Sequence, residues 1–188
     1  MLISSTTPPQ MHAFLKQLQI AAHPSVDLPL FLHNRDTEGE FLAVMREQHA
    51  LYARRGGVVH SYDGSIEEML QLCELGLYIG INGCSLRTEE SHEVVKAIPS
   101  DRLLLETDAP WCGIKKTHPS YQYIKTLFPA EGVKKKEKWE EGFLVKDRNE
   151  PCYLHQVVEV VAALRQVSEQ ELAEQCWLNS ERLFFFEE

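Results

Sequence analysis

Two histidines and two acidic residues stand at the ends of short apolar runs, where they could act together. His33 ends the run PLFLH and His60 ends GVVH, while Glu106 and Asp108 close the run LLLETD. If these runs are parallel strands, their carboxyl ends lie on one edge of a sheet, where α/β enzymes build their sites. Two imidazoles and a carboxylate can hold a divalent metal ion, and such an ion lowers the pKa of bound water for hydrolysis.

Asp108 is the predicted third metal ligand and the expected catalytic carboxylate, with Glu106 close by in the sequence. Alternate residues of an extended strand share a face, so the two acids are expected to point the same way. Glu106 suits a supporting role, in which it orients a ligating histidine through the second ring nitrogen. The alternative is that each histidine is a structural residue whose ring is satisfied by its neighbours.

Residues 109–150 interrupt the regular pattern and are expected to form a long excursion on the carboxyl-end face of the sheet. Long ordered loops are usually functional or mobile. His118 lies in this stretch and is a candidate for substrate contact. The basic run Lys134–Lys138 is either a solvated surface or a patch that attracts phosphate, with Trp139 available to stack on a base. The histidines in helical patterns are interpreted as surface or packing residues: His12, His49, His92 and His155.

Apolar strands and amphipathic helices alternate along the chain, which predicts a parallel α/β sheet with right-handed crossovers. The predicted strands are 29–33, 58–60, 77–81 and 103–107. Capping-box pairs predict helix starts at Thr37 with Glu40, Ser65 with Glu68 and Ser168 with Glu171. Further helices are expected over 11–22, after caps at Thr6 and Thr7, then after Thr88 and from Pro151. The apolar run MLIS is left outside these elements.

The composition suits one folded domain. The chain has 188 residues, 44% of them apolar, and a formal net charge of −9. The acidic balance excludes coating of nucleic acid by charge alone but allows an enzyme with bound metal ions. No stretch approaches the roughly 20 apolar residues of a membrane span, and a signal-peptide pattern is not found. Five widely spaced cysteines are interpreted as reduced thiols of an intracellular protein, cytoplasmic or nuclear.

Several of these motifs also resemble a known family. LPLFLHNRD, GVVHSYDG, LGLYIGINGCSL, LLLETDAPWCG, KDRNEP and NSERLF together look like the TatD family of metal-dependent deoxyribonucleases, and most closely its eukaryotic branch. The resemblance extends from about Gln10 to Phe185. Its most specific part is the E-T-D-A-P-W element, together with the ordered H-x-R, H-S-Y-D-G and R-N-E-P motifs.

The resemblance implies a TIM-type (β/α)8 barrel of the metallo-dependent hydrolase superfamily that hydrolyses DNA phosphodiester bonds as a 3′–5′ exonuclease. It implies His33 and His60 as metal-binding histidines and Asp108 as the metal-binding aspartate. Mg²⁺ is the expected ion, with Zn²⁺ or Mn²⁺ as alternatives. Arg148 in the R-N-E-P element and Arg35 in the H-x-R element are candidate contacts to DNA. The alternative for residues 149–151 is an ordinary helix start.

The chain also departs from the family pattern. A complete barrel needs roughly 250 residues, and this sequence contains neither the family's first-strand H-x-H metal pair nor its G-E-x-G-L-D element. We therefore expect residues 1–188 to form a single partial barrel domain, the C-terminal half of the fold. Such a chain is expected to bind metal weakly, to have little or no nuclease activity and to self-associate through open sheet edges.

Two other functions stay open. One is a different metal-barrel hydrolase, such as an amidohydrolase that cleaves C–N bonds, although the E-T-D-A-P-W and R-N-E-P elements favour the nuclease. The other is a non-catalytic fragment or isoform that acts only by binding. A substrate panel separates the first from a nuclease, and the coding sequence upstream of Met1 decides the second.

Overall fold

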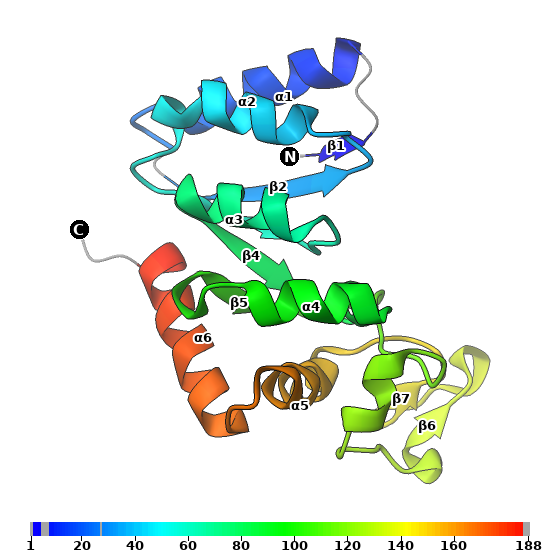
Figure 1. Cartoon of the computed structure of the whole chain (residues 1–188). Helices are drawn as coiled ribbons and strands as arrows, with labels where there is room; N and C mark the ends of the chain where they lie inside the picture. The colour runs from blue at the N-terminus through cyan, green and yellow to red at the C-terminus, as the bar shows by residue number, and fades with distance from the viewer. Residues whose placement is uncertain (1, 5–7, 27, 186–188) are drawn as a thin grey trace. The chain divides into compact units, whose positions relative to one another are not determined.

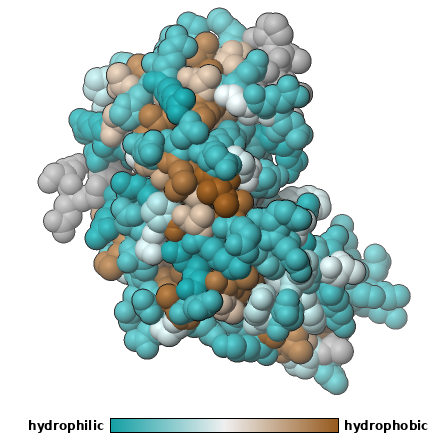
Figure 2. Space-filling model, in the orientation of Figure 1, coloured by the Kyte–Doolittle hydropathy of each residue, from teal (hydrophilic) through white to brown (hydrophobic). Residues whose placement is uncertain are grey.

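The computed structural model describes residues 2–4, 8–26 and 28–185 (Figure 1). The chain forms two compact units: the first comprises residues 1–80, 97–104 and 174–188, and the second comprises residues 81–96 and 105–173. Within the described residues, no helix is both long enough and apolar enough to cross a membrane. The face of the molecule in Figure 2 is mainly hydrophilic, with separate apolar patches.

The main sheet contains five strands in sequential order: β1 (Leu2–Ser4), β2 (Leu30–Arg35), β3 (Gly57–His60), β4 (Leu77–Ile81) and β5 (Leu103–Leu105). Apart from the last residues of β4 and β5, the sheet belongs to the first unit. Neighbouring strands from β1 to β4 pair in parallel. Sequential order with parallel pairing and helical crossovers is the winding of a TIM-type barrel, which confirms the predicted fold class.

β1 lies in the apolar run MLIS, for which the sequence pattern predicts no regular element. The three residues of β1 pair with the end of β2, where Leu2 stands opposite His33 and Ser4 opposite Arg35. So short a run carries no readable periodicity, and it is the pairing with its neighbour that makes it a strand. Thr6 and Thr7, the predicted caps of the next helix, lie outside the described residues.

The core of the first unit combines the sheet with the helices that flank it (Figure 1). These helices are α1 (Pro8–Ala21), α2 (Glu40–Glu47) and α3 (Ile66–Glu74). The register partners Leu32, Val59 and Ile79 form a fully buried row across β2, β3 and β4. Phe14 and Phe41 join α1 to α2, with ring centroids 6.0 Å apart. Each buried side chain of this size contributes about 1.5–3 kcal/mol, so the row fixes the register of the strand ends.

Two of the predicted helix starts have opposite outcomes. The Ser65 cap is confirmed, because its Oγ accepts a hydrogen bond from the main-chain N–H of Glu68 at 3.2 Å. The Thr37 cap is wrong, because α2 begins only after Gly39, which is left-handed with φ 88°. The Thr37 hydroxyl donates instead to Asn34 Oδ1 at 2.7 Å. The Thr37 hydroxyl thus bonds to the Asn34 side chain of β2 and does not cap α2.

Three further helices complete the chain: α4 (Glu89–Ala97), α5 (Leu154–Arg165) and α6 (Glu169–Phe184). The predicted caps Thr88 and Ser168 are confirmed, since each hydroxyl oxygen accepts a main-chain N–H three residues later, at 3.2 and 3.1 Å. The excursion belongs to the second unit and includes a short parallel pair, β6 (Val133–Lys134) and β7 (Leu144–Val145). Short 3₁₀ turns lie at 49–51, 84–86, 100–102, 119–123, 130–132, 136–138 and 151–153.

Candidate metal centre

The two predicted metal-binding histidines lie side by side in the first unit. His33 on β2 and His60 on β3 are register partners, and their ring centroids are 4.9 Å apart with the planes tilted by 41°. The Phe31 ring lies 4.9 Å from the His60 ring and shields it. His60 is only 6% exposed and His33 is half-buried. The strand register therefore brings two imidazoles together in a partly desolvated setting.

The turn after β3 holds His60 in place. Ser61 adopts a left-handed conformation with φ 51°, and its Oγ lies 3.1 Å from His60 Nε2. The next residue, Tyr62, donates its main-chain N–H to Gly80 O at 3.0 Å and its hydroxyl to Ser65 O at 2.7 Å. Burial, and then the nearby Glu68 carboxylate, raise the pKa of Tyr62 well above its usual value, so this hydroxyl stays a donor. The hydrogen bonds of Tyr62 thus hold the turn of the H-S-Y-D-G motif in one conformation.

An acidic groove of about 270 Å³ lies in the first unit, beyond the ends of β2 and β3. Its acidic lining residues are Asp36, Glu38, Asp63 and Glu68. The side chain of Glu68 is fastened there, because its oxygens accept hydrogen bonds from Asn34 Nδ2 and from the Tyr62 hydroxyl, both at 3.3 Å. Carboxylates repel phosphate and attract cations, so this groove suits cations rather than phosphate groups.

Glu106 is held by a buried amide in the second unit. Its main-chain N–H donates to Ile81 O at 3.0 Å, which continues the pairing of β4 and β5 past the end of β5. Asn82, which is 0% exposed, donates its Nδ2 to Glu106 Oε1 at 3.1 Å. The same amide accepts the main-chain N–H of Cys84 at 2.8 Å through Oδ1. The carboxylate of Glu106 is therefore oriented by the segment that follows β4.

Asp108 lies outside the strand, in a strained turn. β5 ends at Leu105, so the alternation of faces that predicted a common direction for Glu106 and Asp108 does not extend to Asp108. Asp108 is left-handed with φ 54°, and its main-chain oxygen accepts the N–H of Trp111 at 2.8 Å. Non-glycine residues in this region cluster at functional sites, where the surrounding structure holds them. This conformation ends the extended backbone at Asp108.

Asn149 fastens the Asp108 turn, a role that sequence reasoning missed because Asn-Glu-Pro was interpreted as a possible helix start. Its Nδ2 donates to Thr107 O at 2.8 Å and to Trp111 O at 2.6 Å, and its main-chain N–H donates to Pro110 O at 3.1 Å. Asn149 is only 8% exposed. Three hydrogen bonds from one residue fix the turn on both sides of Asp108. The signal for it was the R-N-E-P motif itself.

The prediction that all five cysteines are reduced thiols is wrong for two of them. Cys84 and Cys112 form a disulfide, with their Cα atoms 4.9 Å apart. Cys73, Cys152 and Cys176 retain their thiols. The two bonded residues are 28 positions apart in the sequence, and only the adjacency of the segments after β4 and β5 brings them together. Spacing in the sequence could not show this pair.

The three candidate substrate contacts lie in different settings. Arg148 is exposed and forms an ion pair with Glu150, with Nη2 to Oε1 at 2.6 Å. His118 accepts the main-chain N–H of Lys115 at Nδ1, at 3.3 Å, and its pKa is lowered by burial and then by Arg87 and Lys115. Arg35 is exposed at the end of β2. Arg148 and His118 belong to the second unit and Arg35 to the first.

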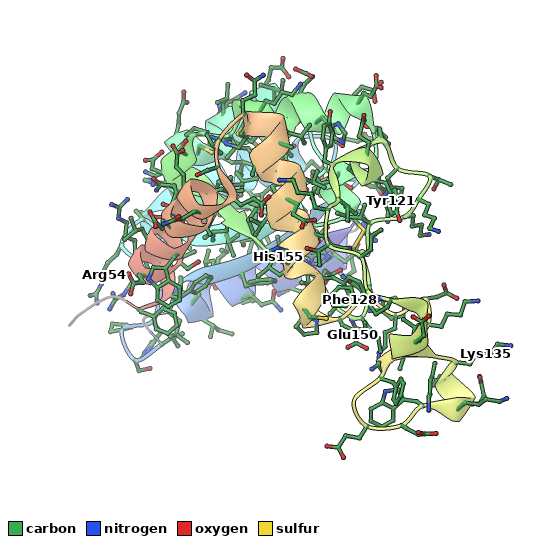
Figure 3. All side chains as sticks on the ribbon, turned by 90° about the horizontal axis from the view of Figure 1, so that it is seen from below. Arg54, Tyr121, Phe128, Lys135, Glu150 and His155 are labelled. Carbon is green, nitrogen blue, oxygen red and sulfur yellow. A yellow bond between two sulfur atoms is a disulfide. The ribbon has the colours of Figure 1, made fainter. Side chains whose placement is uncertain are left out.

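The basic run of the excursion is largely solvated. Lys135 projects into solvent (Figure 3), as expected if the run is a solvated surface. Lys134 differs, because its Nζ pairs with Glu140 at 2.7 Å and lies 3.9 Å from the centroid of the Phe143 ring. The indole of Trp139 is 49% exposed and is anchored by its N–H, which donates to Phe143 O at 2.6 Å. An aromatic face thus remains accessible next to the lysines.

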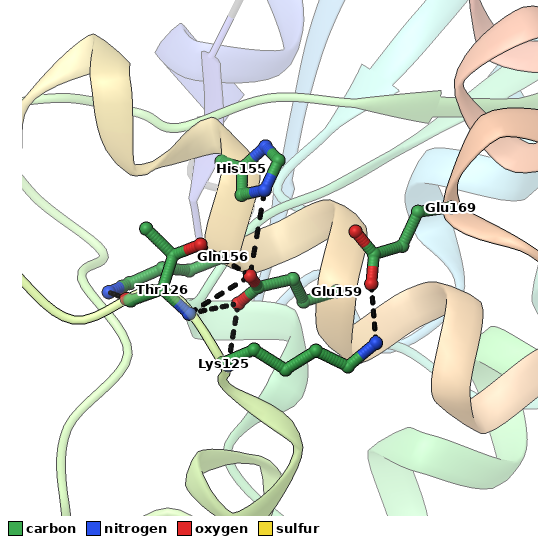
Figure 4. A network of polar contacts seen from close by, with 6 residues as sticks. All are labelled: Lys125, Thr126, His155, Gln156, Glu159 and Glu169. Atoms are coloured by element: carbon green, nitrogen blue, oxygen red, sulfur yellow. Dashed lines mark hydrogen bonds and ion pairs between the residues drawn. The ribbon is translucent and has the colours of Figure 1, made fainter.

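A second polar network joins the excursion to α5 (Figure 4). Glu159 is 2% exposed, and its carboxylate accepts hydrogen bonds from the Thr126 hydroxyl at 2.6 Å and from the main-chain N–H groups of Lys125 and Thr126. His155 Nε2 lies 3.6 Å from Glu159 Oε1, and Lys125 Nζ pairs with Glu169 at 2.6 Å. His155, Glu159 and Glu169 bring three ligand atoms within 4.8 Å. Their existing partners make this group a structural clamp.

Comparison with known proteins shows extensive similarity to one family. The family model described as TatD related DNase matches residues 3–185. Deoxyribonuclease Tat-D of Schizosaccharomyces pombe is 50% identical over 167 residues, which are 89% of this chain and 52% of that protein. The 3′-5′ ssDNA/RNA exonuclease TatD of Erwinia billingiae is 38% identical over 178 residues, which are 93% of this chain and 58% of that protein. The chain spans about half the length of the curated relatives it matches.

Solved structures agree with this similarity. A TatD family hydrolase from Entamoeba histolytica aligns with a TM-score of 0.85 at 31% identity, over 96% of this chain and 58% of that chain. An uncharacterised amidohydrolase from Saccharomyces cerevisiae aligns with a TM-score of 0.83 at 35% identity, over 95% of this chain and 60% of that chain. The family match extends over nearly the whole chain and includes the paired histidines and the E-T-D-A-P-W turn, so the chain belongs to the TatD-related DNase family.

Proposed function

We propose that this chain carries part of the site of a metal-dependent hydrolase that cleaves DNA phosphodiester bonds as a 3′–5′ exonuclease. The observation that carries the proposal is the register of His33 and His60, whose rings lie 4.9 Å apart on two neighbouring parallel strands. Similar proteins are named deoxyribonucleases, and one is named a 3′-5′ ssDNA/RNA exonuclease. Single-stranded DNA is therefore the first substrate to test.

The donor set suits a divalent metal ion. His33 and His60 offer imidazole nitrogens, and Asp108 offers the negative charge that balances the ion. A bound divalent ion would lower the pKa of water and stabilise charge on the phosphoryl oxygens. Glu106, oriented by Asn82 at 3.1 Å, would steady the ligands around it. Mg²⁺ is the expected ion, with Mn²⁺ and Zn²⁺ as the alternatives to compare.

Exposed arginines are the proposed contacts to the phosphate groups of DNA. Arg148 would exchange its ion pair with Glu150, whose Oε1 accepts from both Nε and Nη2, for a phosphate group. Arg35 would neutralise phosphate charge from the end of β2. His118, whose pKa is lowered by burial, would be neutral at pH 7 and would contribute a hydrogen bond rather than a charge.

The test measures metal binding and cleavage separately on the purified chain. Mn²⁺ binding is followed by electron paramagnetic resonance, and cleavage by a labelled single-stranded oligonucleotide with Mg²⁺ or Mn²⁺. We expect measurable but weak Mn²⁺ binding, which His60→Ala reduces by about tenfold or more, and little cleavage by the chain alone. His12→Ala, which removes an exposed histidine of α1, is the matched control and should bind like wild type. Unchanged binding in both His33→Ala and His60→Ala would refute the metal centre.

A second candidate function is hydrolysis of C–N bonds, which the description of the yeast structural neighbour as an amidohydrolase favours. A panel of cyclic and linear amides alongside the oligonucleotide separates the two reactions. Metal-dependent amide hydrolysis without DNA cleavage would replace the nuclease proposal. Metal and DNA binding without either reaction would indicate a chain that acts by binding.

A further inference from the structure

The Cys84–Cys112 disulfide joins the segment after β4, whose Asn82 binds Glu106, to the segment after β5, which contains Glu106 and Asp108. Cys84 opens the 3₁₀ turn Cys84–Leu86, which two residues separate from the end of β4, and Cys112 directly follows the turn Asp108–Trp111. Neither cysteine is among the proposed metal ligands. Both residues belong to the second unit, so the bridge and its neighbours form one continuous piece of structure.

Short contacts lead from this bridge to both carboxylates. Cys112 Sγ lies 3.1 Å from Asp108 Oδ2. On the other side, the main-chain N–H of Cys84 donates to Asn82 Oδ1 at 2.8 Å, and Asn82 Nδ2 donates to Glu106 Oε1 at 3.1 Å. A shift of Cys112 would therefore move Asp108 directly. A shift of Cys84 would move Glu106 through the side-chain amide of Asn82.

The backbone at Gly83 allows the segment after β4 to approach Cys112 closely. A Cβ atom placed on Gly83 would lie 2.1 Å from Cys112 O, so only glycine fits beside the bridge. Cys112 itself is left-handed with φ 56°, like Asp108 with φ 54°. One strained residue begins the four-residue turn and the other directly follows it, and a covalent tie is one way to hold such a turn. Asn149 holds it from the other side through Thr107 and Trp111.

The bridge also differs from the other cysteines in access and surroundings. Cys84 and Cys112 are half-buried, so a small thiol can reach them, whereas Cys73 and Cys176 are buried. The Arg87 Nη2 atom lies 2.8 Å from Cys84 Sγ. A guanidinium at this distance stabilises negative charge on the sulfur, which favours Cys84 as the leaving thiolate when the bridge is opened.

We propose that Cys84 and Cys112 are a reversible redox tether: the disulfide fastens the turn that carries Asp108, and reduction loosens this turn and weakens metal binding. The effect on metal rests on the proposed function, whereas the tether does not. Closure consumes one molecule of a disulfide such as oxidised glutathione. One cysteine thiolate displaces a first glutathione thiolate, the second cysteine displaces the other, and the two protein protons go to the two glutathione thiols.

The first experiment maps the thiols of the full 188-residue chain. The chain is equilibrated with oxidised glutathione, alkylated and analysed by peptide mass spectrometry. We expect a linked Cys84–Cys112 peptide, with alkylation confined to Cys73, Cys152 and Cys176, and five alkylated cysteines after reduction. Alkylation of both Cys84 and Cys112 after oxidation would overturn the proposal. Cys152→Ser, which removes an exposed free thiol, is the matched control and should form the same bridge.

The second experiment measures how tightly the turn is held in each redox state. The amide of Trp111, which donates to Asp108 O, is followed by hydrogen exchange before and after reduction with a phosphine that is then removed. We expect exchange to accelerate by about tenfold or more on reduction and to slow again on reoxidation. The double variant Cys84→Ser with Cys112→Ser should exchange fast under both conditions. Equal exchange in the oxidised and reduced wild-type chain would overturn the tether.

The third experiment measures Mn²⁺ affinity in the two redox states. We expect the oxidised chain to bind about tenfold to a hundredfold more tightly than the reduced chain, which is the range for groups that position metal ligands. Reoxidation should restore the affinity of the wild type but not of the double serine variant. Equal affinity in both states would overturn the effect on metal. Absence of binding in both states would contradict the proposed function, while hydrogen exchange still decides the tether.

Discussion

Asn149 is the residue on which the Asp108 turn depends most directly. One side-chain amide donates to the carbonyl oxygens of Thr107 and Trp111, and these two residues bracket Asp108. The donors of a single buried amide thereby span the whole turn. A carboxyl group of the same size offers no donor at neutral pH, so substitution tests the hydrogen bonds without changing the packing volume.

Asn149→Asp is expected to lower the free energy of unfolding by about 2 kcal/mol at pH 7. The change leaves two partly buried carbonyl groups without this donor and places a negative charge near them. Urea unfolding of wild type and variant measures the difference. Cys152→Ser, at an exposed neighbouring position, is the control and should unfold like wild type. Equal unfolding midpoints for Asn149→Asp and wild type would show that the clamp carries no stability.

Glu159 is expected to make stability depend on pH. Burial works to raise the pKa of Glu159, but hydrogen bonds from Thr126 and from the main chain of Lys125 outweigh it, and the pKa lies below its ordinary value of 4.5. A carboxyl with a depressed folded-state pKa contributes stability above its unfolded-state value and loses it as pH falls through the folded-state value. The contribution is therefore complete at pH 7 and declines below about pH 4.5.

Urea unfolding of Glu159→Gln at several pH values tests this dependence. We expect the variant to be less stable than wild type at pH 7, with a difference that shrinks as the pH is lowered below about 4.5. Glu141→Gln, at an exposed position, is the control and should show no such trend. A difference that grows on acidification would contradict the assignment.

At the scale of elements, α3 is set in place by its cap and by the turn before it. The Ser65 Oγ accepts the N–H of Glu68, and the Ser65 carbonyl accepts the hydroxyl of Tyr62. Tyr62 is in turn bonded to β4 through Gly80. Hydrogen bonds thus link the start of α3 to the turn after β3, and His60 is the last residue of β3.

Ser65→Ala is expected to lower the free energy of unfolding by about 1 kcal/mol, because one N–H group of the first helical turn loses its acceptor. Ser65→Asp, which keeps a side-chain acceptor at the same position, should retain most of the stability. Thermal or urea unfolding compares the three proteins. A loss as large in Ser65→Asp as in Ser65→Ala would mean that the hydroxyl acts elsewhere than in the cap.

At the scale of the whole molecule, we predict that the chain self-associates. In the described part of the chain, β1 and β5 are the outermost strands of the sheet, and outer strands present unpaired backbone groups. Phe31 also leaves 52% of its surface exposed on β2. Sedimentation or light scattering over a range of concentrations should show a mass that rises above 21.6 kDa. A constant monomer mass at every concentration would contradict the prediction.

Much of the fold and part of the site could be predicted from local patterns. The apolar runs that end in His33 and His60 marked two strands, and the Ser65 cap marked the helix after them. Each pattern depends on residues close together in the chain, where geometry follows from backbone periodicity. The same logic failed for Thr37, because a side chain from another element, Asn34, competes for its hydroxyl.

The sequence by itself determined the order of the strands β2 to β5 and of the helices, and the chemical types of the candidate ligands, since both follow from local periodicity and side-chain chemistry. Only the tertiary structure decided that β1 is a strand, that Asn149 clamps the Asp108 turn and that Cys84 meets Cys112. Each of these features joins residues far apart in the chain. Such contacts form because parallel strands end at one edge of the sheet, and packing rather than spacing selects which segments meet there.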